Sequence, residues 1–417
     1  MRRLLELGKD LAILALLGLA VALALYIILP GPMFQLLNGT KSLLHPQAST
    51  AALRLQQPEA QEAVRPNLVS VQGENGRTTW QYSFLETDAA YESLGRWLGE
   101  ALGTSGEAEP ITLDAWLEAL ASPGVYYRFP GSVPLRALAD WLGAEFSGGI
   151  SGTMTASAFA VSVIGERVLL SYQAGADYVR CDTQLSPEAL LGALETYGSD
   201  GSLFAFEGAE DYPQLAAMDP CALIPMTAVS VPTAEIQSQL STEDVAVVFG
   251  FNPYGDTSYT ASTGARVFSD SDSRLEVLGG RLSYTTARKQ WVAASDTAVT
   301  ETARSLLEEL TAGSLGDARL YLTGFDRTGD TVALTFGYLV SGIPVTLTAG
   351  PAARVTFTGG ALTALELEAR TITLRDETQH LMPALQAAAL LPPGQSLALG
   401  YAEAGDETLV CGWRAAD

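Results

Sequence analysis

The residues that could perform acid–base or metal chemistry are few and scattered. The chain of 417 residues has two histidines, His45 and His380. The carboxylate nearest to His380 in the sequence is Glu377, and on a helix this spacing is typical of an exposed surface pair. No three nitrogen, sulfur or carboxylate ligands stand at the short spacings of a zinc site. We therefore expect no metal and no cofactor, which excludes most metallohydrolases.

Motifs for nucleophilic catalysis and ligand-binding loops are equally weak. The sequence has no G-x-S-x-G elbow, and its one Ser/Thr-x-x-Lys match, Thr286 to Lys289, lacks the companion motifs of acyl-serine enzymes. The glycine-rich run at 148–152 has no lysine of a phosphate loop and is typical of a turn. Asp270-Ser271-Asp272 lacks the rest of a calcium loop and indicates a hairpin tip. A carboxylate pair for glycoside hydrolysis stays open, but no pair is singled out. We therefore expect that this chain is not an enzyme.

The cysteines do not form a disulfide framework. There are three, Cys181, Cys221 and Cys411. A bridge between Cys181 and Cys221 is permitted in an oxidising compartment. The interpretation that we favour is three small buried hydrophobic residues.

The strongest signal in the sequence is an uncharged stretch near its start. Residues 11–40 contain no Asp, Glu, Lys, Arg or His, and residues 11–29 are almost wholly apolar. About 20 apolar residues in a helix cross a hydrocarbon core of roughly 30 Å, and Pro30-Gly31-Pro32 ends such a helix at the interface. The sequence therefore predicts a transmembrane helix over 11–30.

The flanking charges predict the orientation of this helix. Arg2, Arg3 and Lys9 precede it, whereas the next cation, Lys41, lies beyond the Pro-Gly break. Positive charge stays inside, so residues 1–10 are expected to be cytoplasmic and the bulk of the chain extracytoplasmic, held at the cell membrane by a single pass. A cleaved signal peptide is the alternative, because residues 20–24 offer two small-residue cleavage patterns, but five apolar residues follow them.

Small residues share one face of the predicted membrane helix. They recur at steps of three, three and four: Ala12, Ala15, Gly18 and Ala22. Small side chains let two helices approach closely in lipid. These four residues are our candidates for packing against a membrane partner.

The remainder of the chain is acidic and long enough for two domains. The net charge is −23, which argues against binding to nucleic acid or to anionic lipid. We predict a stalk over 31–66, an N-terminal α+β domain over 67–240 and a C-terminal α+β domain over 241–417. The predicted fold class is α+β, with one N-terminal transmembrane helix followed by an extracytoplasmic region of small antiparallel sheets with packed helices.

Periodicity and turn residues place the elements of both domains. In the first we expect a hairpin over 68–84, helices over 87–102 and from 112, 134 and 186, and strands over 124–130, 156–163 and 167–172. In the second we expect strand and turn throughout 245–287, a helix over 296–310, four strands (319–325, 331–339, 353–358 and 362–370), a helix over 377–391 and a hairpin over 397–413. Mixed strands and helices without a regular βαβ series indicate α+β.

The segment 249–287 resembles the YycH family. The resemblance is carried by Gly250-Phe251-Asn252-Pro253, Tyr259-Thr260 with Gly264, Val267-Phe268, and the stretch from Gly280 to Tyr284. Residues 124–135 are similar to another element of that family, and residues 336–366 and 401–413 to the terminal domain that YycH shares with YycI. The chain departs from the family pattern at Ser269-Asp270-Ser271-Asp272 and in its scarcity of Arg and Lys.

This resemblance implies regulation without catalysis. YycH-like proteins bind the sensor histidine kinase YycG of the YycF/YycG two-component system and a sister protein, YycI, partly through the transmembrane helix. They tune a kinase output that controls peptidoglycan hydrolases. The expected partners are therefore a YycG-type sensor histidine kinase and a YycI-like protein. An anchored or secreted binding module or protease inhibitor of the cell envelope is the alternative function, and an unrecognised cell-wall hydrolase is a third.

Overall fold

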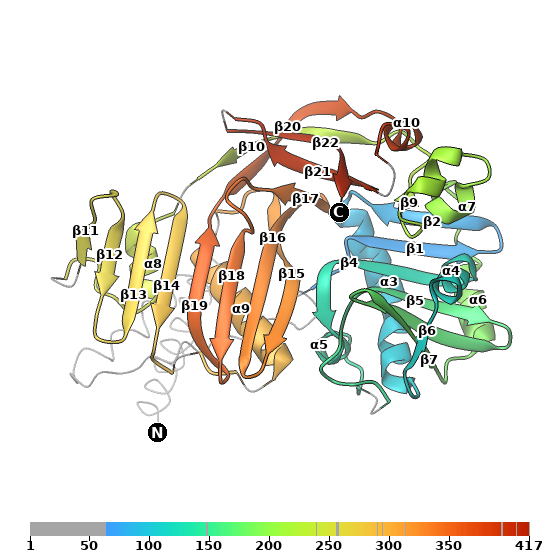
Figure 1. Ribbon diagram of the computed structural model, residues 1–417, viewed down its shortest axis with the longest axis horizontal. Coiled ribbons are helices and arrows are strands. Elements are labelled where there is room, and N and C mark those ends of the chain that lie inside the picture. Colours follow the sequence, from blue (N-terminus) through green and yellow to red (C-terminus); the bar gives the residue numbers. More distant parts are fainter. Residues whose placement is uncertain are drawn as a thin grey trace, which may run out of the picture. The chain divides into compact units, whose positions relative to one another are not determined.

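Figure 1 shows a computed structural model of the chain. It describes residues 64–416 except 147–148, 239, 256–257, 290, 294, 313, 393–394 and 406. The predicted transmembrane helix over 11–30, its four small residues and nearly all of the predicted stalk lie outside these residues. Within the described part of the chain, no helix is long and apolar enough to cross a membrane.

The first half of the described chain is organised around one antiparallel sheet. Its strands are β1 (Leu68–Gly73), β2 (Gly76–Gln81), β3 (Glu109–Ile111), β4 (Gly124–Pro134), β5 (Thr155–Ile164), β6 (Arg167–Ala174) and β7 (Asp177–Asp182). They lie in the order β2-β1-β4-β5-β6-β7-β3. The helices are α3 (Phe84–Thr104), α4 (Leu113–Ala121), α5 (Leu135–Trp141) and α6 (Pro187–Leu194), and β8 (Leu203–Phe204), α7 (Ala205–Gly208), the 3₁₀ turn Pro213–Ala217 and β9 (Leu223–Ile224) follow.

Both faces of this sheet are covered. Successive strand residues point to opposite faces, so Tyr127 of β4 packs in the cluster formed with α3, α5 and α6, whereas Tyr126 packs with α4 and with Phe204. The Tyr127 hydroxyl also donates to the Leu94 carbonyl of α3 at 2.7 Å. One sheet is thereby held between two helical layers.

A second sheet takes up the rest of the chain, with 13 strands among the described residues. Its elements are β10 (Ser230–Gln237), α8 (Thr242–Val248), β11 (Ser258–Thr260), β12 (Arg266–Ser269), β13 (Ser273–Leu278), β14 (Arg281–Thr286), α9 (Asp296–Leu310), β15 (Ala318–Thr328), β16 (Thr331–Val340), β17 (Ile343–Thr346), β18 (Ala353–Thr358), β19 (Ala361–Glu368), β20 (Thr371–His380), α10 (Ala384–Ala388), β21 (Ser396–Glu403) and β22 (Thr408–Ala416). The strand order is β11-β12-β13-β14-β19-β18-β16-β17-β21-β22-β10-β20, and β15 pairs with β16.

Side-chain caps fix where the longer helices begin. Ser295 accepts a hydrogen bond from the amide of Ala298 at 3.1 Å, so α9 begins at the predicted residue. Thr112 and Ser186 cap α4 and α6 in the same way. The apolar face of α9, which includes Leu306, packs in the same cluster as Phe357 of the second sheet.

The two sheets share one core within the unit Leu55–Asp417. Strand β4 of the first sheet lies against β15, and a Cβ atom added at Gly131 would stand 2.1 Å from the Thr323 carbonyl oxygen. Thr297 of α9 donates to Asp140 of α5 at 2.5 Å. Strand β10 lies within 67–240, the range predicted for the N-terminal domain, but it pairs with β20 and β22 of the second sheet.

The mixed α+β class is confirmed, but three details of the prediction are wrong. The helix expected over 377–391 is the end of β20 and the short helix α10, because β20 pairs with β10 as far as His380 and Pro383 favours extended structure before it. The stretch 245–287 is not strand and turn throughout, because Ser241 caps α8. The sheets are large rather than small, and β17 pairs with β21 in parallel.

Candidate functional site

The candidate membrane-packing residues precede the part of the chain that the structure describes. Ala12, Ala15, Gly18 and Ala22 lie outside the described residues, as does His45. His380 is exposed at the end of β20. Glu377 stands three positions earlier on the same strand, so the two residues do not form the helical surface pair that we expected.

The motif Asp270-Ser271-Asp272 forms a hairpin turn. Asp270 lies in the tight turn between β12 and β13, where its Oδ1 accepts from the amides of Asp272 and Ser273, both at 2.9 Å. The cation at this hairpin tip is Arg288, whose Nη2 lies 2.5 Å from Asp270 Oδ2. Within the described ranges, no three His, Cys, Asp or Glu residues are grouped so that they could hold a metal ion.

Thr286 of the Ser/Thr-x-x-Lys match is hydrogen-bonded across two strands. The Thr286 hydroxyl shares a 2.7 Å hydrogen bond with that of Ser273 in the neighbouring strand. Lys289 is exposed beyond the end of β14. Thr286 is therefore occupied in cross-strand pairing.

The three cysteines are buried and free. Cys221 packs beside α4 and accepts a hydrogen bond from Trp116 Nε1 at 3.2 Å, whereas Cys181 belongs to the cluster on the other face of the sheet. Burial raises the pKa of each of these two thiols to about 11. Cys181 and Cys221 are unbridged in the structure and would be protonated at neutral pH, in agreement with the interpretation as small buried hydrophobic residues.

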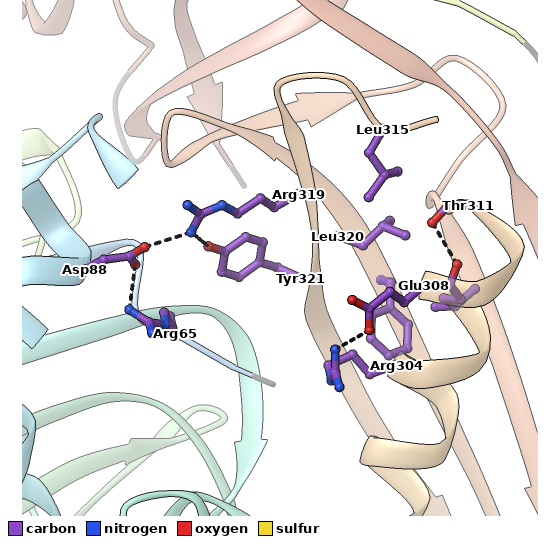
Figure 2. A pocket seen from close by; sticks show the side chains of 11 residues that line it. Arg65, Asp88, Arg304, Glu308, Thr311, Leu315, Arg319, Leu320 and Tyr321 are labelled. Carbon is purple, nitrogen blue, oxygen red and sulfur yellow. Dashed lines mark hydrogen bonds and ion pairs between the residues drawn. The ribbon is translucent and has the colours of Figure 1, made fainter. Parts of the chain in front are cut away.

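A pocket of about 340 Å³ lies between α3, α9 and β15 (Figure 2). Its lining combines charged side chains with leucines and aromatic rings: Arg65, Asp88, Arg304, Leu307, Glu308, Thr311, Leu315, Arg319, Leu320, Tyr321 and Phe336. A volume of this size suits a small ligand or one side chain of a partner.

One wall of the pocket is built around Asp88 of α3. Its carboxylate pairs with Arg319 of β15 at 2.8 Å and with Arg65 at 3.5 Å. The Arg319 guanidinium also lies 4.3 Å above the Phe84 ring, and that ring stacks on Tyr321 with centroids 5.9 Å apart. Burial raises the pKa of Tyr321. Figure 2 shows Arg319 and Tyr321 extending from β15 toward Asp88 and Arg65, whereas Leu320 lies on the side of α9.

The opposite wall is the last two turns of α9. Arg304 pairs with Glu308 at 2.9 Å and with Glu301 at 3.3 Å. Its Nη2 atom is nevertheless buried without a hydrogen-bond partner in the described structure, as is Glu301 Oε1. Burial raises the pKa of Glu301 although Arg304 acts to lower it. A carbonyl or carboxylate oxygen entering here would satisfy Nη2.

The remaining lining is apolar. Leu307 and Phe336 are buried, and Leu315 and Leu320 are half-buried beside them. The pocket therefore suits a group with an apolar body and an oxygen acceptor. Sequence reasoning missed this site because nothing local marks it: Asp88 and Arg319 stand 231 positions apart and meet only when β15 docks beside α3.

Comparison with known proteins assigns no family. Neither a family model, nor a curated protein, nor a solved structure matches this chain.

Proposed function

We propose that this chain is a membrane-anchored extracytoplasmic regulator that binds a YycG-type sensor histidine kinase, together with a YycI-like protein, and changes the kinase output by contact rather than by catalysis. The resemblance of residues 249–287 to the YycH family names the partners. The observation that carries the proposal is the order of residues at the start of the sequence.

That order is three cations, one apolar stretch and a helix-breaking Pro-Gly-Pro. Arg2, Arg3 and Lys9 precede residues 11–29, and Pro30 follows them closely. Such an arrangement anchors a chain by one pass and leaves the rest outside the cytoplasm. A single helix that both anchors the chain and carries small residues on one face is suited to lateral contact with another membrane helix.

The pocket between α3, α9 and β15 is consistent with a binding role. Its arginines are held by carboxylates beside leucine and phenylalanine side chains. These groups recognise an oxygen acceptor and an apolar surface. The pocket draws on both halves of the described chain, so its occupancy can bias how α9 and α3 pack.

Co-purification from native membranes tests the proposal. The full-length chain carries an affinity tag at its cytoplasmic end, and the kinase is sought in the detergent extract bound to it. A matched control replaces residues 11–29 by an unrelated apolar helix. Retention of the kinase by the natural chain, together with a changed kinase-dependent reporter when the gene is deleted, supports the proposal. Absence of the kinase from the bound fraction and an unchanged reporter would contradict it.

A further inference from the structure

A second pocket, of about 400 Å³, lies where the first sheet meets the second. Its walls come from β1, β2, β4, β5, β15, β17 and β21 and from the segment that precedes β9. It is separate from the pocket of Figure 2, because the two share no lining residue. All of its lining residues belong to the described part of the chain.

Two opposite charges line this pocket without pairing. Arg128, an exposed residue of β4, makes no ion pair with any described residue. Asp219 also makes none; its Oδ1 accepts the amide hydrogen of Cys221 at 2.9 Å, and its carboxylate is also hydrogen-bonded to the Cys221 side chain. Both charges act on the same neighbours, because Arg128 lowers and Asp219 raises the pKa of Tyr126 and of Cys221. A cation and an anion that have no ion-pair partner among the described residues therefore stand near one another at one pocket.

An unsatisfied amide stands beside the arginine. The side-chain oxygen of Asn67 is buried and has no hydrogen-bond partner in the described structure. The Asn67 backbone amide donates to the Arg128 carbonyl at 2.9 Å, so the two residues are held side by side. A buried oxygen that lacks a donor is unfavourable, and a ligand N–H would relieve it.

The backbone next to the pocket is strained. Tyr82, between β2 and α3, has a φ of 64°, a left-handed conformation that is uncommon for a bulky side chain. Its ring packs edge-on against Trp413 with centroids 6.4 Å apart. A Cβ atom added at Gly342, which itself has a φ of +80°, would lie 3.6 Å from the Tyr82 nitrogen. Such strain persists where packing fixes it, and it is frequent at ligand sites.

We propose that this pocket binds a zwitterionic ligand, a free amino acid or a dipeptide. Its carboxylate pairs with Arg128, its ammonium group with Asp219, and one of its N–H groups donates to Asn67. A volume of about 400 Å³ suits a ligand of this size. The inference goes beyond the proposed function and does not depend on the kinase.

Calorimetric titration of the purified full-length chain tests the site. The probes are the twenty free amino acids and alanyl-alanine, with N-acetyl-alanyl-alanine and alanyl-alanine amide as analogues that lack one charge each. We expect at least one zwitterion to bind and its blocked analogues to bind about 10- to 100-fold more weakly, as expected for loss of a charge-assisted contact. Failure of every zwitterion to bind would overturn the proposal.

Three substitutions locate the binding. Arg128→Gln and Asp219→Asn are each expected to lower the affinity for the zwitterion by about 10- to 100-fold. Arg167→Gln is the matched control, because Arg167 is an exposed arginine of the same sheet that pairs with Asp182 away from the pocket. Thermal unfolding of each ligand-free variant confirms that the fold is kept. Unchanged affinity in Arg128→Gln, or an equal loss in Arg167→Gln, would overturn the assignment.

Discussion

Arg77 ties β2 to the segment that contains β8 and α7. Its side chain is 4% exposed, pairs with Glu207 through both terminal nitrogens, and donates to the Leu120 carbonyl at 2.9 Å. Its guanidinium also lies 4.4 Å above the Phe204 ring. One side chain therefore joins β2, α4 and the segment after α6.

Removing this arginine should be costly. Arg77→Ala leaves Glu207 partly buried without its cation, so we expect a loss of about 3–5 kcal/mol in the free energy of unfolding. Arg167→Ala is the control, because its pair with Asp182 is 67% and 61% exposed and should contribute about 1 kcal/mol or less. Urea unfolding of both variants measures the difference. Equal stability of the two variants would contradict the role of Arg77.

Glu309 makes stability depend on pH. It lies in the last turn of α9, its Oε2 is buried without a hydrogen-bond partner in the described structure, and burial raises its pKa above 4.5. The folded state therefore holds this proton more tightly than the unfolded state. The contribution of protonated Glu309 to the free energy of unfolding is fully present below pH 4.5. It is lost as the pH rises through the raised pKa of the folded state.

Glu309→Gln should consequently stabilise the protein at pH 7 and change little at pH 4. Removing a negative charge from a helix C-terminus contributes about 0.3–1 kcal/mol. Glu308→Gln is the control in the same turn. It also removes a negative charge but loses the 2.9 Å pair with Arg304, so its free energy of unfolding should show almost no net change. Unfolding in urea at both pH values is the measurement. A gain for Glu309→Gln that is the same at pH 4 and pH 7 would refute the explanation.

At the scale of elements, the approach of β4 to β15 joins the two sheets. Only a glycine fits at position 131, because any Cβ atom would meet the Thr323 carbonyl group. We expect Gly131→Ala to cost about 1–3 kcal/mol through overpacking. Gly192→Ala in α6 is the matched control, since no atom lies within 4 Å of its added Cβ, and it should be neutral or stabilising by up to about 1 kcal/mol. Similar urea unfolding midpoints for Gly131→Ala and Gly192→Ala would show that the contact between Gly131 and Thr323 is looser than described.

Sequence patterns predicted elements well where the signal was local. The helix over 296–310 was exact because Ser295 caps it and its apolar residues recur at helical spacing. The helix expected over 377–391 was wrong, because pairing of β20 with β10 depends on residues about 140 positions earlier and leaves no local trace. The same limit explains why the two pockets could not be predicted from the sequence: neither the Asp88–Arg319 pair nor the position of Arg128 beside Asn67 follows from the spacing of residues.

At the scale of the whole molecule, we expect the predicted transmembrane helix over 11–30 to contribute to partner recognition. Gly18→Leu or Ala22→Leu should weaken association with the kinase, because a bulky side chain separates backbones that must approach closely. Leu17→Ile, on the opposite side of the predicted helix, should have little effect. Crosslinking of the full-length chain to the kinase in membranes measures this. Equal crosslinking of the natural chain and both leucine variants would place recognition in the extracytoplasmic region instead.

The most direct test of regulation by contact is the phosphorylation rate of the kinase itself. The full-length chain and the YycG-type kinase are reconstituted in the same vesicles at increasing ratios, and the rate of kinase autophosphorylation is measured. We expect the rate to change with the ratio and to saturate when every kinase has a partner, and the chain with its helix replaced to have a weaker effect. A rate that stays constant at every ratio would contradict the proposed function.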